Sequence, residues 1–289
     1  MHFTLPALIT LSVLFCFFSS VTSAEQLIRY PQAGPLFTKH HQYPVELLKL
    51  ALSYQSEKID IKASDYFMTQ GRAIKQLTSG KDIDVMWTMT SQERESEIRP
   101  IRVPIYKGLI GWRLFLSTEE WLSDIPNKVL SLAELKQAVI IQGHDWPDTE
   151  ILAYNQFNVL SGSSYEGLFQ ILSLNRAELF PRSVIEIWDE LDTYESSNIR
   201  LEHHTLISYP TASYFFVSPE NKFLANIIEN GLNKAHKDGR FEKLFNLYYQ
   251  GTIRKSELIN RQHYRLENPL LPKNTPLENK SYWFNLDKI

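Results

Sequence analysis

Residues 70–94 read QGRAIKQLTSGKDIDVMWTMTSQER, a helix pattern that passes directly into a strand pattern. Ala73, Ile74 and Leu77 fall on one face of a helix, and Gly80 provides its C-terminal stop. The apolar run at 83–87 is short enough for a buried strand. A helix followed at once by a buried strand is the repeating unit of α/β domains, so this stretch predicts an α/β fold.

The same alternation extends in both directions along the chain. Strand patterns lie at 26–30, 59–61, 138–142, 157–160, 200–208 and 213–218, and helix patterns at 44–52, 224–239 and 241–249. Ser131, Ser163 and Ser183 each precede a glutamate by three positions, which is the capping-box signature of a helix start. Three prolines between 269 and 276 forbid a long helix there, so we expect an extended tail over 251–289.

The composition narrows the class of protein. Of the 289 residues, 43% are hydrophobic and 22% are charged, and the formal net charge is -3. This apolar content excludes a disordered chain, and the lack of a basic excess argues against a nucleic-acid partner. The length corresponds to two lobes or to one large domain, and either can bury a full core.

The N-terminus predicts the compartment. Residues 1–24 contain no Lys, Arg, Asp or Glu, and the apolar run at 5–18 is followed by small residues up to Ala24. This pattern predicts an export signal cleaved after Ala24, with an uncleaved membrane anchor as the alternative. The only cysteine, Cys16, lies inside this segment. The mature chain then has no thiol for catalysis, zinc binding or disulfides, which suits a Gram-negative periplasm.

Signatures of metal-dependent or nucleophilic catalysis are missing from the sequence. The pairs His40-His41 and His203-His204 would each place neighbouring rings on opposite faces of a strand, so neither pair chelates a metal alone. The patterns G-x-S-x-G and H-E-x-x-H do not occur. We therefore expect no metal, no cofactor and no enzymatic activity.

The order and spacing of several short motifs resembles the type II periplasmic solute-binding proteins of family 3, which include the amino-acid receptors of ABC transporters. The motifs lie at 71–80, 82–85, 90–94, 132–135, 142–143, 174–178 and 230–239, within about residues 26–250. The resemblance implies a two-lobe α/β fold with a ligand cleft between the lobes. Lobe 1 would span 25–110 and 209–250, lobe 2 would span 111–208, and the tail would pack on lobe 1.

The function implied by this resemblance is that of a monomeric periplasmic receptor. It would capture a small polar solute, amino-acid-like or related, by closing its lobes, and would serve a membrane transporter or a sensor. Two alternatives remain open. One is an enzyme on the same scaffold, and the other is an interaction protein whose cleft binds no small molecule.

In the first lobe, four residues are expected at the ligand. The arginine of the motif that matches 90–94 forks onto the ligand carboxylate in amino-acid receptors, and Arg94 occupies that position. Trp87, Thr88 and Thr90 follow the preceding strand, at the end where such sheets bind ligands. Trp87 is equally interpreted as a core residue. For Arg94, the alternative is a surface ion pair with one of three glutamates nearby in the sequence, Glu93, Glu95 and Glu97.

The second lobe is expected to contribute a loop that enters a helix. Relatives hold the ligand carboxylate on backbone amides of this loop, whose candidate residues here are Gln142, Gly143, His144 and Trp146. This sequence departs from that pattern, because three acids crowd the same helix start, Asp145, Asp148 and Glu150. A second anion there would be repelled, so a cationic or neutral polar ligand is easier to accommodate.

The last two candidates are Arg182 and Glu186. Amino-acid receptors place an aspartate near this position to bind the ligand amine, but residues 180–183 contain no acid. Arg182 would change the ligand preference, and Glu186 is either a ligand contact or the cap of its own helix. The sequence therefore leaves the identity of the solute open.

Overall fold

The computed structural model of the chain describes residues 1, 26–32, 34, 38–125 and 128–288. Apart from Met1, the predicted signal segment 1–24 lies outside these residues. Within the part of the chain that the structure describes, no helix is both long enough and apolar enough to cross a membrane.

The first lobe contains five strands in two groups, one parallel and one antiparallel. Strand β1 pairs in parallel with β2, and the antiparallel strands β3 and β4 flank β11. The amide of Asp84 donates to the carbonyl of Arg29 at 2.8 Å and joins the two groups. The strands are β1 (Gln26–Gln32), β2 (Ile59–Phe67), β3 (Val85–Met89), β4 (Arg99–Ile101) and β11 (Ser213–Val217). The helices are α1 (Thr38–Leu52), α2 (Gln70–Ser79), α3 (Gln92–Glu97), α9 (Lys222–Lys237) and α10 (Arg240–Lys255).

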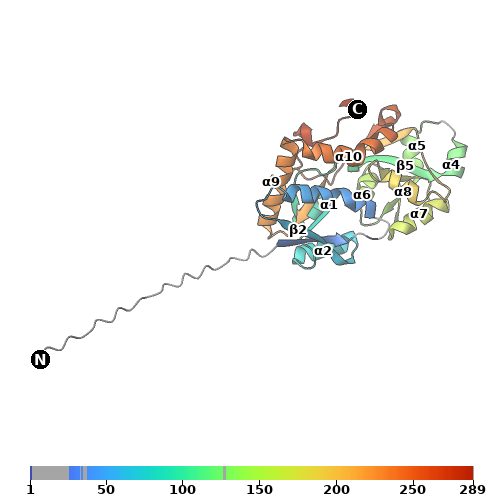
Figure 1. Cartoon of the computed structure of the whole chain (residues 1–289). Helices are drawn as coiled ribbons and strands as arrows, with labels where there is room; N and C mark the ends of the chain where they lie inside the picture. Colours follow the sequence, from blue (N-terminus) through green and yellow to red (C-terminus); the bar gives the residue numbers. More distant parts are fainter. Residues whose placement is uncertain (2–25, 33, 35–37, 126–127, 289) are drawn as a thin grey trace.

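The second lobe is built around a sheet of order β12-β10-β5-β8, with β9 also paired to β5. The parallel pair β6-β7 joins this sheet through a bridge between Ile140 and Leu179. The strands are β5 (Trp112–Thr118), β6 (Val139–Gly143), β7 (Asn158–Gly162), β8 (Phe180–Ser183), β9 (Ile199–Leu201), β10 (Thr205–Ser208) and β12 (Gln262–Arg265). The helices are α4 (Glu119–Asp124), α5 (Leu132–Gln137), α6 (Pro147–Tyr154), α7 (Tyr165–Ser173) and α8 (Ile187–Thr193). Figure 1 shows α2 and α9 at one end of the folded body and α4, α5 and α7 at the other.

The predicted α/β alternation is confirmed, and several helix starts are where the sequence places them. Helix α2 ends at Gly80, whose φ of 65° is left-handed, and Ser131 forms the complete capping box of α5. Helix α7 is capped by Ser164 instead of Ser163. The predicted box at Ser183 is wrong, because Ser183 ends strand β8 and α8 begins only after Glu186, which makes no side-chain cap.

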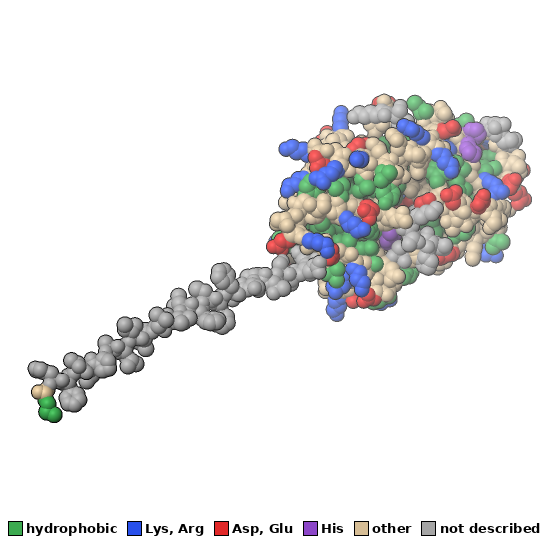
Figure 2. Space-filling view, viewed as in Figure 1, with side chains coloured by type: hydrophobic (Ala, Val, Ile, Leu, Met, Phe, Trp, Pro, Cys, Tyr) green, Lys and Arg blue, Asp and Glu red, His purple; other side chains and the backbone are tan. Residues whose placement is uncertain are grey.

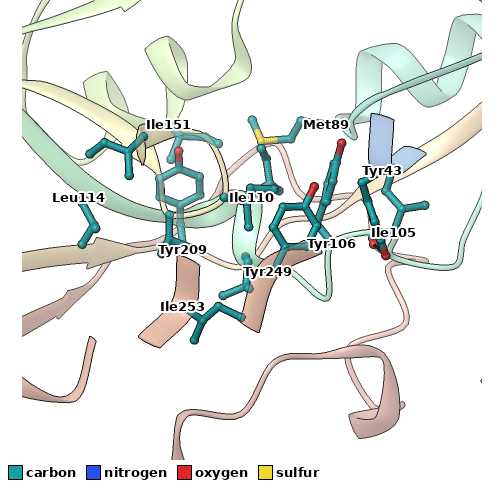
Figure 3. Packing of buried hydrophobic residues seen from close by; sticks show 14 of the residues in the cluster. Tyr43, Met89, Ile105, Tyr106, Ile110, Leu114, Ile151, Tyr209, Tyr249 and Ile253 are labelled. Carbon is teal, nitrogen blue, oxygen red and sulfur yellow. Dashed lines mark hydrogen bonds between the residues drawn. The ribbon is translucent and has the colours of Figure 1, made fainter. Parts of the chain in front are cut away.

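Before the tail begins, two segments of chain connect the lobes, 102–111 between β4 and β5 and 209–212 between β10 and β11. They run against each other, since the amide of Tyr209 donates to the carbonyl of Gly111 at 3.2 Å. A side chain at Gly111 would place a Cβ 2.3 Å from the oxygen of Tyr209, so only glycine fits this approach. Figure 3 shows Tyr106 and Tyr209, one from each segment, within the buried core. Buried residues of both lobes and of both connecting segments therefore belong to one hydrophobic core.

The tail after α10 contacts both lobes, which differs from the expected packing on lobe 1 alone. Strand β12 pairs in parallel with β10 at the edge of the second sheet. Arg261 is buried beside it and donates to the carbonyl of Glu202 at 2.7 Å. The chain then returns to the first lobe, where the amide of Gln92 donates to the carbonyl of Leu270 at 3.1 Å. The short turns of this region are η3 (Leu258–Asn260), η4 (Lys280–Tyr282) and η5 (Leu286–Lys288), and η2 (Leu109–Gly111) precedes β5.

The visible surface has no region of one charge sign. Figure 2 shows Lys and Arg side chains interspersed with Asp and Glu over the face it presents. This distribution matches the near balance of 30 basic and 33 acidic residues. On that face, the surface offers no concentrated field for steering a highly charged polymer.

Two helical glycines provide a matched test of this packing. A Cβ at Gly231 in α9 would lie 2.0 Å from the carbonyl oxygen of Ala51 in α1, whereas a Cβ at Gly251 in α10 would meet nothing within 4 Å. We predict that Gly231→Ala lowers the free energy of unfolding by roughly 1–3 kcal/mol, because the two helix backbones must separate. Gly251→Ala should be neutral or stabilising by up to about 1 kcal/mol, since alanine favours the helix. Urea unfolding followed by circular dichroism measures both; equal midpoints for the two variants would contradict this packing.

Candidate ligand-binding site

A cavity of about 470 Å³ lies between the two lobes. Its size is within the roughly 300–1,000 Å³ of typical small-molecule sites. The first lobe contributes the end of β3, the start of α2 and Arg94, and the second lobe contributes the starts of α6 and α7. Tyr106 and Ile110, from one of the connecting segments, form part of its wall. The cavity thus takes its walls from both lobes and from one of the segments that connect them.

Seven of the ten predicted site residues line this cavity: Trp87, Thr88, Arg94, Gly143, Trp146, Arg182 and Glu186. The other three are engaged elsewhere. The hydroxyl of Thr90 donates to Glu95 Oε1 at 2.7 Å, and the buried Gln142 donates to the carbonyl of Pro181 at 3.2 Å. His144 is exposed, with Nδ1 3.3 Å from the carbonyl oxygen of Gly162.

Arg94 spans the cleft between the lobes. Its amide is capped by Ser91 at the start of α3, and its guanidinium turns inward, 8% exposed. Nη1 donates to Thr88 Oγ1 and to the carbonyl of Met89, both at 2.8 Å. Nη2 donates to Gln70 Oε1 and, across the cleft, to the carbonyl of Asp145 at 3.2 Å. Burial lowers the pKa of Arg94 to about 10, although Asp145 and other nearby acids oppose the shift.

The alternative prediction for Arg94, a surface ion pair, is wrong, because Arg94 is buried. In the described part of the chain, no ion pair joins Arg94 to Glu93, Glu95 or Glu97. Glu95 pairs with Arg102 instead. The arginine is therefore a buried cleft residue whose four Nη hydrogens already have acceptors inside the protein.

The wall formed by the second lobe contains a buried charge network centred on Arg182. Its guanidinium is 4% exposed and makes a bidentate contact with Glu190, with distances of 2.9 Å from Nε to both carboxylate oxygens. Glu186 Oε2 lies 3.2 Å from Arg182 Nη2, and Tyr165 donates to Glu190 at 2.7 Å. Burial alone would lower the pKa of Arg182, but Glu190 and Glu186 outweigh it and hold the pKa well above its ordinary value.

A second buried arginine, Arg113, extends the network to the connection between the lobes. It pairs with Asp148 at the start of α6, and Glu186 Oε2 lies 3.6 Å from its Nη1. Arg113 Nε also donates to the hydroxyl of Tyr209 at 3.0 Å, and that hydroxyl donates to Asp148. One arginine on β5 therefore fixes a helix start and a connecting segment at the same time.

Aromatic faces complete the cavity. Trp146 stacks on Phe180 with the ring planes 14° apart, and the Arg182 guanidinium carbon lies 4.8 Å from the Trp146 ring centroid. A side chain at Gly143 would collide with the Trp146 ring, at 2.5 Å, so glycine there allows the ring to lie flat on the loop. Trp87 is half-buried and contacts both His41 and Phe215. Trp87 thus lines the cavity and also packs against the core. The sequence had offered these two positions as alternatives.

Several cavity residues were not predicted from the sequence, among them Gln70, Tyr165 and Arg113. For Arg113, a signal was present: it is the only charged residue in the apolar run at 112–116. A charge inside a buried strand requires a buried partner, which makes such a residue a candidate for a polar site. Gln70 and Tyr165 carry no comparable signal, because each lies in an ordinary first turn of a helix.

The Arg182–Glu190 pair yields a stability prediction. Glu190→Gln leaves Arg182 buried without its nearest carboxylate, so we expect the free energy of unfolding to fall by roughly 3–5 kcal/mol. The control is Glu46→Gln, which breaks the exposed pair of Lys49 and Glu46 and should cost less than about 1 kcal/mol. Urea unfolding measures both. A Glu190→Gln protein as stable as the wild type would show that Glu186 alone satisfies the arginine.

Comparisons with known proteins address the fold. No protein-family model and no curated protein matches the chain by sequence. Solved structures do match: an ancestral arginine-binding protein bound to arginine superposes with a TM-score of 0.59 at 15% identity, over 78% of this chain and 98% of that one. An arginine third-transport-system periplasmic binding protein from Legionella pneumophila gives 0.59 at 14% identity, over 78% and 100%. A histidine kinase sensor domain with similarity to periplasmic binding proteins gives 0.56 at 13% identity, over 78% and 95%. The chain therefore has the two-lobe α/β fold of these periplasmic binding proteins, at 15% sequence identity or less to the three structures named.

Proposed function

We propose that this protein is a periplasmic solute-binding receptor that captures a small polar solute by closing its two lobes. The observation that carries the proposal is the cavity of about 470 Å³, which takes its walls from both lobes and from the connection between them. A ligand that contacts both walls stabilises the closed arrangement by its differential affinity for that state. The matching solved structures are described as binding proteins or a sensor domain, which supports binding instead of catalysis.

The lobes of the proposed receptor are 25–110 with 209–250 and 111–208. The hinge would lie in the two connecting segments, where Gly108 has a φ of 78° and Gly111 approaches Tyr209 closely. Closure would bring Arg94 of the first lobe to Asp145 of the second, the contact that the structure contains at 3.2 Å. A solute would enter when this contact opens and would be enclosed when it forms.

The proposed partner of the closed receptor is a membrane transporter, and the proposed location follows from the predicted signal at 1–24. A sensor is the second candidate partner, because a histidine kinase sensor domain shares the fold. We propose that the receptor acts as a monomer without cofactor. Co-purification of the protein with a transporter or with a kinase from membranes of the producing cell would decide between these partners.

The proposal is tested with the purified chain from residue 25 onward. Thermal shift against amino acids, polyamines, organic acids, sugars and peptidoglycan fragments should give at least one hit, since free ligand at about 100 times its Kd adds about 2.7 kcal/mol. Small-angle scattering should then show a more compact particle with the hit than without it. Ligand recovered unchanged supports a receptor, converted ligand supports an enzyme, and no hit in the whole library contradicts the proposed function.

A tryptophan pair provides the matched test of the cavity. Trp87→Leu removes a ring from the cavity wall, and we expect it to weaken binding of the identified solute at least about tenfold. Trp121→Leu changes a half-buried tryptophan on α4 that does not line the cavity, and it should leave the Kd within about twofold. Isothermal titration calorimetry measures both, after circular dichroism has shown that each variant folds. Equal effects of the two substitutions would place the solute elsewhere.

A further inference from the structure

The charged side chains of the cavity favour one class of solute. Carboxylates outnumber the cations in its lining: the acids are Asp145, Asp148, Glu166 and Glu186, and the cations are Arg94, Arg113 and Arg182. Glu190 adds a further carboxylate directly behind Arg182. A solute with a carboxylate therefore enters a region of negative excess unless one of the three arginines is available to it.

Arg94 can bind a solute carboxylate only by giving up one of its present hydrogen bonds. A bidentate fork onto a carboxylate uses two N–H donors, and at least one of them must come from an Nη atom. The Nη donors of Arg94 are occupied by Thr88, Met89, Gln70 and Asp145. A carboxylate would have to displace one of these buried acceptors and leave it unsatisfied, which offsets the gain of the fork.

The two arginines of the second lobe are equally committed. Arg113 and Arg182 are 3% and 4% exposed, and both are held by buried carboxylates. Two amides of the loop before α6 are also occupied. The amide of His144 donates to Gly162 at 3.0 Å, and that of Trp146 donates to Gly143 at 3.1 Å. The helix start that could hold an anion is thus partly bonded within the protein, and it is flanked by Asp145 and Asp148.

A cation finds a different situation. Glu186 lines the cavity with its side chain 23% exposed, and it makes no helix cap. Its distances to Arg113 and Arg182, 3.6 and 3.2 Å, are longer than those of the Arg182–Glu190 contact. The same cavity is also lined by five aromatic residues, Phe67, Trp87, Tyr106, Trp146 and Tyr165. Such faces attract ammonium and guanidinium groups and also bury an apolar body.

We propose that the cleft selects an organic cation that needs no carboxylate, an amine or guanidinium head on a largely apolar body, with Glu186 as the counter-charge. This inference rests on the proposed receptor function and specifies its solute. The proposed solute differs from a standard α-amino acid because it lacks the carboxylate, the group that Arg94 would otherwise bind.

Pairs of compounds that differ only in the carboxylate provide the experiment. Titration calorimetry on the purified chain would compare agmatine with arginine, putrescine with ornithine, cadaverine with lysine, and tyramine with tyrosine. We expect at least one amine to bind about tenfold tighter than its parent amino acid. If every amino acid binds as tightly as its amine or more tightly, or if no amine binds, the inference is overturned. The receptor function fails separately, only if the whole solute library gives no hit.

Two substitutions locate the counter-charge with the best amine of these pairs. Glu186→Gln should weaken it at least about tenfold, whereas Glu178→Gln, which precedes β8 and does not line the cavity, should change its Kd by less than about twofold. Full binding of the amine by Glu186→Gln would overturn the assignment of Glu186. The titrations on the wild-type chain decide the class of solute even if a variant fails to fold.

Discussion

The buried pair of Arg113 and Asp148 is the interaction on which the geometry of the cleft depends. Arg113 belongs to the central strand of the second sheet, and Asp148 belongs to the first turn of α6. A single unpaired charge at this depth would cost several kcal/mol, so the folded chain must place the two groups together. Tyr209 closes the arrangement from the connecting segment by hydrogen bonding both of them. Strand, helix start and hinge are thereby fixed by three polar side chains.

The position of the cleft contacts follows from this constraint. With the start of α6 held by Asp148, the preceding residue Trp146 lies flat over Gly143, and the carbonyl of Asp145 points to Arg94. Arg94 in turn holds Gln70 at the first turn of α2. These contacts, together with the backbone from Asp145 to Asp148, therefore link the second sheet to the first lobe. A solute that closes the proposed receptor has to bind the closed arrangement more tightly than the open one, because only a difference in affinity shifts the population.

The sequence was most informative where the structure is local. The helix over 70–80, its glycine stop and the strand after it depend on neighbouring residues, and each formed close to the predicted bounds. Motif order also placed seven of ten candidates on the cavity, since the starts of helices and the ends of strands gather at one edge of a sheet. Gln142 and His144 differ because their side chains contact partners distant in the sequence, Pro181 and Gly162. Thr90 bonds the nearby Glu95 instead. Helix α1 likewise begins at Thr38, whereas the predicted helix pattern begins at residue 44, so Pro44 lies inside the helix.

The path of the tail could not be predicted from local patterns, because its contacts are with residues distant in the sequence. These contacts bear on the proposed hinge. After α10, the chain passes between the lobes a third time to reach β12. The amide of Phe284 then donates to the carbonyl of Lys107 at 2.8 Å, and Asn268 donates to the carbonyl of Pro210 at 2.9 Å. Both connecting segments therefore have a backbone carbonyl bonded to the tail. The proposed opening of the lobes therefore has to carry the tail along with both segments or break these bonds. The tail would thus restrict that motion through residues that do not line the cavity.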